Sequence, residues 1–518
     1  MLGKRTKISK TVFLSSFTLK KKRVDLKHFL NFKNIFILSF FYAFTLAQGL
    51  NALTLKEALE VVVKNQKKTK SIDFDLESIN QQKKSLDGQF DTQINAKTYV
   101  GYNRNLSQNL PTEKIQSFSR EVSVMKKTSW GTQFNLSYNS LYSDMDFGSS
   151  GTFVQNPMPL ASITNPFYQT SLEFKVQHPL YRNNYNQEYL IQKKIFDSQK
   201  QFSSYEKNIF LQNIQSEVEH LFLQYTFLEE QIDNMLKLVE ESKILLSLIT
   251  KDIKIGLSET KDEISAQSDL IELKGQLLGL EIERNKISIS LLHKVYAGTP
   301  PKNITIEQIS LKDAVSSFPA TNAEEALKHA LQKRFDFKKM KQSKDKIKLE
   351  MNLLEESKKT DINAFLSYKS NNIDGEFYKS LSGTLSQEHP NITIGVNLNY
   401  NIDKTSYNTK KKEFINHLEK VDTEQSIIID TIKSQLEVSY YQKNSADLQI
   451  KQYKDHITAL EKIVAEEKLK IKQARSNDTN LSRYKMNIYR AQTNLLKSWM
   501  NKRSAEVQIK NLCHSYSS

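Results

Sequence analysis

The histidines and the acidic side chains are the residues of this sequence that could bind a metal ion or transfer protons. No two histidines lie within four residues of each other, so none form a helical zinc-ligand pair. The nine are His28, His178, His220, His293, His329, His389, His417, His456 and His514. Acids such as Glu229 and Glu230 fall on the flanks of a heptad pattern, where solvated side chains are expected.

Motifs that would bind nucleotides or activate a nucleophile are also missing from the sequence. It has no Walker loop, no glycine-rich dinucleotide turn and no nucleophile elbow. The sequence therefore predicts no catalytic, cofactor-binding or metal-binding residue. We do not expect the protein to be an enzyme.

Helix-breaking residues are rare in this chain of 518 residues, which has 14 Gly and 9 Pro. Residues 180–255 and 396–518 contain neither type, so very long helices are expected there. Cys513 is the only cysteine, which excludes a disulfide scaffold. No stretch of about 20 apolar residues follows residue 50, which excludes a multi-span helical membrane protein.

The net charge of +16 is concentrated near the N-terminus, where residues 1–47 hold ten basic side chains and one acid. Nucleic-acid binding is therefore not expected. The apolar run Ile35–Leu46 follows this basic stretch and precedes Ala47 and Ala52. This layout predicts a signal peptide over 1–52, cleaved after Ala47 or Ala52, with a signal anchor as the alternative.

An internal duplication is indicated by two short matches that share one offset along the chain. Thr54-Leu-Lys-Glu57 has the pattern of a helix-capping box, and Asn322-Ala-Glu-Glu-Ala-Leu327 repeats its layout. Ile94-Asn-Ala96 matches Ile362-Asn-Ala364 in the same register. We therefore predict repeats at 53–297 and 322–512, a linker at 298–321 and a tail at 513–518.

Each repeat is expected to contain a short first helix, two strands, a very long helix and a return helix. The strands lie near 92–105, 168–180, 360–370 and 391–402, and they alternate apolar and polar residues. In the last strand, one face carries Ile392, Ile394, Val396 and Leu398. Such strands suit a half-buried sheet or a lipid-facing barrel, and the signal peptide favours the barrel.

The polar insert at 106–167 is predicted to be an elaborated outer loop. It contains an alternating hairpin within 119–144, and whether this hairpin joins the barrel is left open. The helices are expected at 183–254, 260–296, 404–473 and 479–511. Apolar residues recur along them at heptad spacing, which predicts coiled-coil packing between antiparallel neighbours.

The arrangement resembles the TolC-like outer-membrane efflux proteins over nearly all of residues 53–512. The resemblance rests on the Leu53 start and its copy at Asn322, on Gln177-His-Pro-Leu-Tyr-Arg182, and on Lys254-Ile-Gly256 followed by Asp262. It implies a mainly α-helical homotrimer with a twelve-stranded membrane barrel on a periplasmic helical tunnel. It also implies outer-membrane lipid, a periplasmic adaptor and an inner-membrane transporter as partners.

The sequence departs from this family in two places, one after the outer strand of the second repeat and one at its helical tip, and both bear on adaptor docking rather than on the architecture. The second repeat reads Tyr400-Asn-Ile-Asp403 without a proline, and Ala474 occupies the glycine position of the second tip. Gly256 and Ala474 are the candidate adaptor contacts. The resemblance places Asn480 and Arg483 where the family has an acidic pair at its periplasmic aperture, with Asp262 as a further candidate.

The predicted function is passive conduction of substrates that a partner pump exports, in efflux or type I secretion. The alternative is a structural periplasmic or surface coiled-coil protein with a small sheet and no channel activity. Neither the transported substrate nor the particular pump and adaptor can be identified from the sequence.

Overall fold

The computed structural model describes residues 52–104, 114–146, 165–301, 304–308, 310–312 and 322–513. The chain divides into a small unit, Met1–Ala52 with Asn303–Thr305, and a large unit, Leu53–Lys302 with Ile306–Ser518. The predicted signal peptide lies outside the described residues except for Ala52, and so does the tail after Cys513. The description below concerns the large unit.

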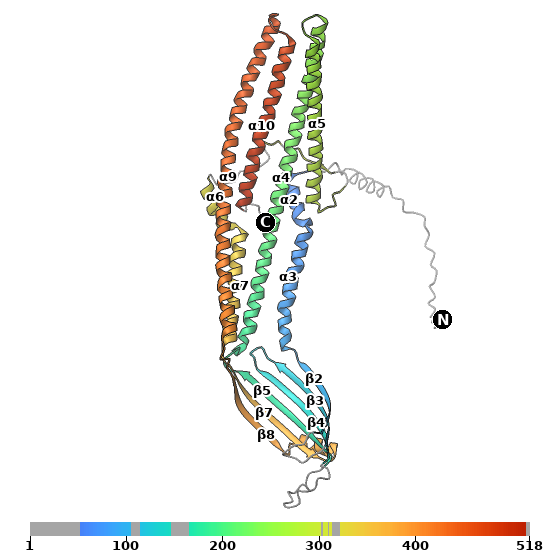
Figure 1. The fold of residues 1–518 in the computed structure, drawn as a ribbon, viewed down its shortest axis with the longest axis vertical. Helices are drawn as coiled ribbons and strands as arrows, with labels where there is room; N and C mark the ends of the chain where they lie inside the picture. The colour runs from blue at the N-terminus through green and yellow to red at the C-terminus, as the bar shows by residue number, and fades with distance from the viewer. Residues whose placement is uncertain are drawn as a thin grey trace, which may run out of the picture. The chain divides into compact units, whose positions relative to one another are not determined.

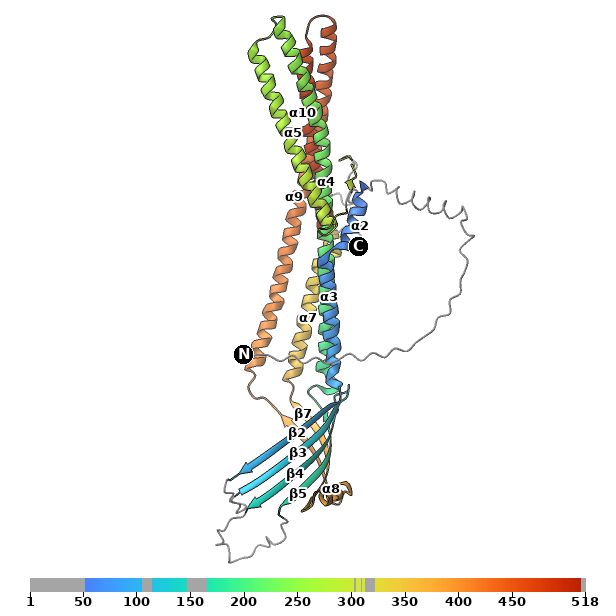
Figure 2. The ribbon, with the colours of Figure 1, turned by 90° about the vertical axis from the view of Figure 1, so that its right-hand side faces the viewer.

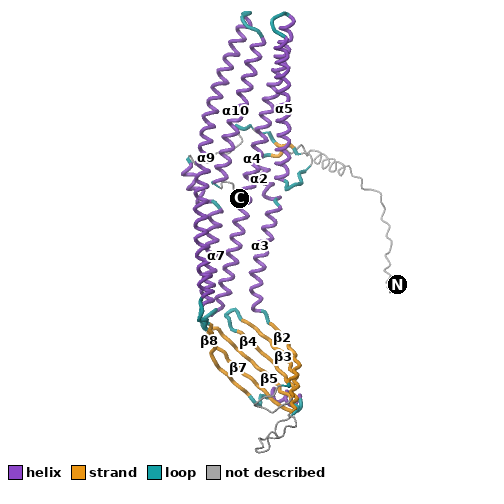
Figure 3. Tube along the Cα trace, in the orientation of Figure 1, coloured by secondary structure: helices purple, strands orange, loops and turns teal. Residues whose placement is uncertain are grey.

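Helices make up most of the large unit, and an antiparallel sheet follows them at one end (Figures 1 and 3). The helices are α2 (Leu55–Asn65), α3 (Lys67–Ser85), α4 (Gln187–Lys254), α5 (Thr260–Val295), α6 (Ala323–Lys333), α7 (Phe335–Lys358), α8 (Phe377–Leu385), α9 (Thr405–Lys472) and α10 (Asp478–Leu512). The strands of the sheet are β2 (Gln93–Asn103), β3 (Lys114–Lys127), β4 (Gln133–Asp146), β5 (Phe167–Pro179), β7 (Asp361–Asp374) and β8 (Pro390–Asn399). Two-residue strands β1 (Ala52–Leu53) and β6 (Thr305–Ile306) complete the described strands.

The two helical halves of the chain are built to the same plan. Helices α4 and α9 each have 68 residues, or about 100 Å at 1.5 Å per residue. Helix α4 begins at position 187 and α5 at 260, while α9 begins at 405 and α10 at 478, so both halves keep the same internal spacing. In Figures 1 and 2 the α4–α5 and α9–α10 pairs each form an antiparallel hairpin that ends in a tip distant from the sheet.

The short first helix that the sequence predicts for each repeat is interrupted once. The capping box at Thr54 is present, and Asn322 caps the equivalent helix by accepting from the Glu325 N–H. Gln66 then separates α2 from α3, and Arg334 separates α6 from α7, both in extended backbone. The two breaks are related by the same offset as the two caps, so the local interruption is duplicated too.

The predicted heptad seam is confirmed as the core of the helical part. Its residues on α4 include Ile214, Val218, Leu228, Ile232, Met235 and Val239, all of which are buried. Around Met235 and Val239 they pack with Leu270 and Leu273 of α5 and Met486 of α10. No helix in the described part of the chain combines the length and apolar composition needed to cross a membrane.

The sheet has six strands rather than the four predicted, in the order β2-β3-β4-β5-β7-β8. The insert at 106–167 supplies β3 and β4, so the alternating hairpin that the sequence indicates within 119–144 joins the sheet, which the sequence had left open. These strands pair antiparallel with each other, with β2 and with β5, which satisfies backbone groups that a loop would expose. The hairpin therefore widens the sheet without interrupting it.

Candidate functional site

The sheet has one apolar face and one polar face along its whole width. One row across all six strands carries Ile94, Val124, Leu136, Phe174, Tyr368 and Ile392. The next row, which points to the opposite face, carries Asn95, Ser123, Ser137, Glu173, Lys369 and Asn391. This pattern is the one expected of a sheet that lies between an apolar and an aqueous environment.

The predicted lipid-facing residues of the last strand lie together on the apolar face. Ile392, Ile394, Val396 and Leu398 are all exposed, and the largest exposed fraction is 79%, at Ile394. Gly395 on the other face lies against the Phe365 ring, which itself faces the Lys175 ammonium group 5.2 Å from its centroid. The alternation of this strand is therefore as the sequence predicts.

The junction between sheet and helices is organised around Asn186, which is fully buried. Its side-chain amide donates to the backbone oxygens of Thr128 and Ser129, at 2.9 and 2.8 Å, in the turn that joins β3 to β4. Asn183, Tyr185 and Asn186 adopt left-handed backbone conformations between β5 and α4. The added hairpin is thus fixed to the start of α4.

The two helical tips share one backbone conformation despite their different residues. Gly256 has φ +76° and Ala474 has φ +53°, each two residues after the last residue of its helix. At the first tip, Ile255 and Leu257 present apolar side chains to solvent. Both candidate adaptor positions therefore lie in the exposed turns that end α4 and α9.

The single substitutions Gly256→Ala and Ala474→Gly should change the stability of their tips in opposite directions. A left-handed conformation costs a residue with a Cβ about 1–2 kcal/mol, so Gly256→Ala should destabilise its tip by about that amount. Ala474→Gly should stabilise the second tip by less than about 1 kcal/mol, because glycine adds about 0.4–1 kcal/mol of unfolded-chain entropy. Amide hydrogen exchange over 250–262 and 468–482 measures both. Slower exchange in Gly256→Ala would contradict the assigned conformation.

The candidate aperture residues lie in the first turns of the two return helices. Asn480 and Arg483 of α10 are exposed, and Arg483 forms no ion pair or hydrogen bond within the described residues. The Asp262 carboxylate accepts the Glu259 N–H at 3.1 Å in a capping box that starts α5. Asp262 is therefore engaged in its own helix start, whereas Asn480 and Arg483 point away from the chain's core.

Contacts beside these residues fix the start of α10 against α4. The Thr479 hydroxyl donates to Asp252 at 2.8 Å, and the Ser482 hydroxyl donates to Glu241 at 2.8 Å. Lys485 pairs with the same buried Glu241 at 3.2 Å. Sequence inspection missed these residues, because their partners lie in the other half of the chain and only the packing of α10 on α4 brings them together.

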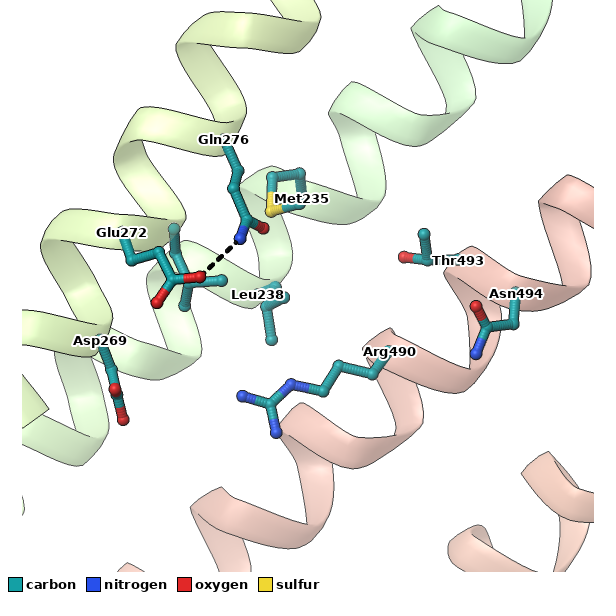
Figure 4. Close-up of a pocket in the computed structure, with 9 residues that line it drawn as sticks. Met235, Leu238, Asp269, Glu272, Gln276, Arg490, Thr493 and Asn494 are labelled. Atoms are coloured by element: carbon teal, nitrogen blue, oxygen red, sulfur yellow. Dashed lines mark hydrogen bonds between the residues drawn. The ribbon is translucent and has the colours of Figure 1, made fainter.

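A groove between α5 and α10 lies one heptad further from the tips than Asp262 and Arg483 do (Figure 4). Arg490 extends from α10 across the groove, and Asp269 and Glu272 line its α5 side. Gln276 donates to Glu272 at 3.0 Å. Arg483 and Asp262 precede Arg490 and Asp269 by one heptad, so the spacing places them on the same sides of their helices.

The long helix hairpins joined to an antiparallel sheet define the fold of the TolC-like outer-membrane channels, and solved structures confirm it. CusC matches over 90% of this chain and 92% of its own, with a TM-score of 0.62 and 8% identity. VceC of Vibrio cholerae, an outer membrane protein, matches over 89% and 95%, with a TM-score of 0.59 and 9% identity.

The MtrE outer membrane channel of Neisseria gonorrhoeae matches over 89% of this chain and 88% of its own, with a TM-score of 0.60 and 10% identity. No family model matches the sequence, and a comparison with curated proteins found no match. At these identities the likeness establishes the fold, and the predicted fold class of long helices with antiparallel strands is confirmed.

Proposed function

We propose that this chain is one protomer of a trimeric outer-membrane channel that passively conducts substrates exported by an inner-membrane pump. The observation that carries the proposal is the open sheet with one apolar and one polar face. Strands can cross lipid only when all their backbone groups are paired, so such a sheet needs further copies to close it. The apolar face would contact lipid, and the polar face would line the lumen.

The edges of the sheet support closure by identical copies. Strands β2 and β8 form the two edges, and because six strands alternate in direction, β2 and β8 run in opposite directions. The β8 strand of one copy can therefore pair antiparallel with the β2 strand of the next. Three copies would close eighteen strands in place of the twelve that the family resemblance implies. Barrel diameter grows roughly linearly with strand number, so this barrel would be about one and a half times as wide.

Exposed apolar side chains on the helices provide independent support for self-association. Helix α5 buries Leu270 and Leu273 inside the chain, yet it carries a second apolar stripe on another face. That stripe contains the exposed residues Ile264, Ile271, Leu278, Ile282 and Ile289. Helix α9 likewise exposes Ile427, Tyr441 and Leu448. Stripes at heptad spacing are typical of faces that pack on another helix, which neighbouring copies would supply.

The tips would meet the periplasmic adaptor, and the pump would supply the energy, because the sequence contains no nucleotide-binding motif. Ile255 and Leu257 beside Gly256 offer an exposed apolar contact of the kind that such docking uses. The exposed turn at Ala474 would provide the second contact of each protomer.

Fractionation of cells that express the full chain tests the channel function. We expect the protein in the outer-membrane fraction as SDS-resistant trimers that dissociate on heating. A protein that is soluble after cell lysis would instead support the alternative, a structural periplasmic coiled coil without channel activity.

The aperture proposal predicts a change in ion selectivity for Arg483→Asp. Three Arg483 side chains near the threefold axis would disfavour cations, since like charges in a constriction focus the local potential. Single-channel recordings should show Arg483→Asp to be more cation-selective than the wild type and blocked by divalent cations from the periplasmic side. Arg475→Asp, the same charge change in the exposed tip turn, is the control. Equal selectivity of the wild type and Arg483→Asp would remove Arg483 from the aperture.

A further inference from the structure

Helix α8 joins β7 to β8 and packs against the sheet with its small polar side chains. Ser380 and Thr384 are buried, and their hydroxyls lie 3.0 and 2.7 Å from the hydroxyl of Thr170 on β5. The Ser370 hydroxyl on β7 donates to the Thr384 backbone oxygen at 2.7 Å. Gly383 lies so close to the Asn372 side chain that a Cβ at this position would clash with it.

Two large apolar side chains of α8 point away from the sheet, whereas Phe377 and Leu381 are half-buried. Tyr378 is 81% exposed and Leu385 is 62% exposed. A helix that packs on a soluble core normally buries its apolar side chains and exposes its polar ones. Helix α8 instead buries Ser380 and Thr384 and exposes Tyr378 and Leu385 beside the charged Lys379, so its mixed outer surface is suited to the boundary between lipid and water.

Helix α8 lies on the apolar face of the sheet, over Thr170 of β5 and Ser370 of β7. Thr170, which contacts it, shares a face with Phe174, and the Phe174 row continues through Tyr368 to Ile392. The Tyr368 hydroxyl donates to Gln387, just after α8, at 2.9 Å. The exposed surface of α8 is thus continuous with the apolar face. Figure 2 shows α8 at the end of the sheet that is farthest from the helical tips.

An aromatic row connects α8 to two neighbouring strands. The ring centroids of Tyr142 on β4 and Tyr168 on β5 are 5.0 Å apart. Tyr168 lies 5.8 Å from Phe377, and Phe377 lies 5.5 Å from Tyr378. Aromatic rows at one level of a barrel mark the boundary between the hydrocarbon and the lipid headgroups.

From these contacts we infer that α8 is an interfacial helix that lies in the outer leaflet of the membrane, with Tyr378 and Leu385 inserted at the headgroup boundary. This inference rests on the proposed function, because it requires the apolar face to contact lipid. The exposed surface of α8 would then contact lipid. The aromatic row would fix how deeply the outer end of the barrel lies in the membrane.

Site-specific fluorescence quenching in proteoliposomes of phosphatidylcholine tests the inference with the full chain. A thiol-reactive, environment-sensitive dye is placed at Tyr378→Cys, with Leu385→Cys as a second site on α8. Val396→Cys and Asn397→Cys report the two faces of β8. The native Cys513 is buried, and burial raises the pKa of its thiol to about 12, so it reacts little at neutral pH.

The labels on α8 should be quenched several-fold more strongly by lipids that carry a spin label near the headgroup than by lipids labelled at the chain end. The label at Val396→Cys should show the reverse order, and the label at Asn397→Cys should respond to aqueous iodide. Iodide quenching without lipid quenching at both α8 sites, with Val396→Cys still quenched by lipid, overturns the inference and leaves the proposed function standing. Loss of lipid quenching at Val396→Cys would overturn the proposed function itself.

Discussion

Replacing Val396 by arginine should prevent stable membrane insertion of the sheet. Val396 lies on the apolar face of the ten-residue strand β8, opposite Ala364, and its side chain is 65% exposed. An arginine on the lipid face near the bilayer midplane costs about 2–4 kcal/mol, and three copies would each incur this cost. We expect a strong loss of SDS-resistant trimer from the outer-membrane fraction, measured by quantitative blotting of unheated samples.

The adjacent residue Asn397 provides a matched control on the same strand. It is paired with Asn363 on the polar face, so Asn397→Arg would place its charge in the aqueous lumen. Substitutions at exposed polar positions usually change stability by less than about 0.5 kcal/mol, and the trimer should form normally. Equal trimer yields for the two variants would show that the faces of the sheet are misassigned.

Replacing Lys510 by methionine should strongly destabilise the helical part. Both oxygens of the Glu219 carboxylate on α4 accept from the Lys510 ammonium group on α10, at 3.1 and 2.9 Å. The Glu219 side chain is only 2% exposed. Removing one partner of a buried ion pair leaves an uncompensated charge and typically costs about 3–5 kcal/mol. The urea midpoint of helix unfolding, followed by far-UV circular dichroism, should fall accordingly.

The double variant Glu219→Leu/Lys510→Met separates the charge effect from lost packing. Because an apolar pair of similar volume can replace a buried ion pair at little cost, this variant should recover most of the wild-type midpoint. A double variant that is less stable than Lys510→Met alone would show that packing, and not the unpaired carboxylate, is the cause.

The long helices and their seams follow from features that are local in the sequence. The absence of glycine and proline between 180 and 255 and the heptad spacing of residues such as Val218 and Met235 specify α4 and its buried face. The alternation from Ile392 to Leu398 likewise specifies the two faces of β8. Each pattern lies within a single helix or strand and depends only on which of its sides is apolar, so it can be recognised without a structure.

The hairpin of β3 and β4 and the helix α8 depend on contacts between distant residues. The alternation at Val122 and Val124 indicates a hairpin, but the pairing of Val124 with Ile94 and Leu136 decides that it joins the sheet. Ser380 and Thr384 look like ordinary loop residues until their contact with Thr170, in the first half of the chain, is known. A nine-residue helix that buries small polar side chains and leaves some apolar ones exposed has no distinctive local pattern.

Disulfide cross-linking across the sheet edges tests the central claim, that three copies close one barrel by pairing β8 with β2. A cysteine at Ile394 on β8 is combined in turn with one at Ile94, Ala96, Thr98 or Val100 on β2, all on the apolar face. Directly opposed residues of an antiparallel pair have Cβ atoms about 4.5–5.5 Å apart, within reach of a disulfide after small adjustments. Oxidised and heated samples should contain a covalent species of three chains for at least one combination, and none larger. A disulfide within one chain, a ladder beyond three chains, or no cross-link in any combination would contradict the account.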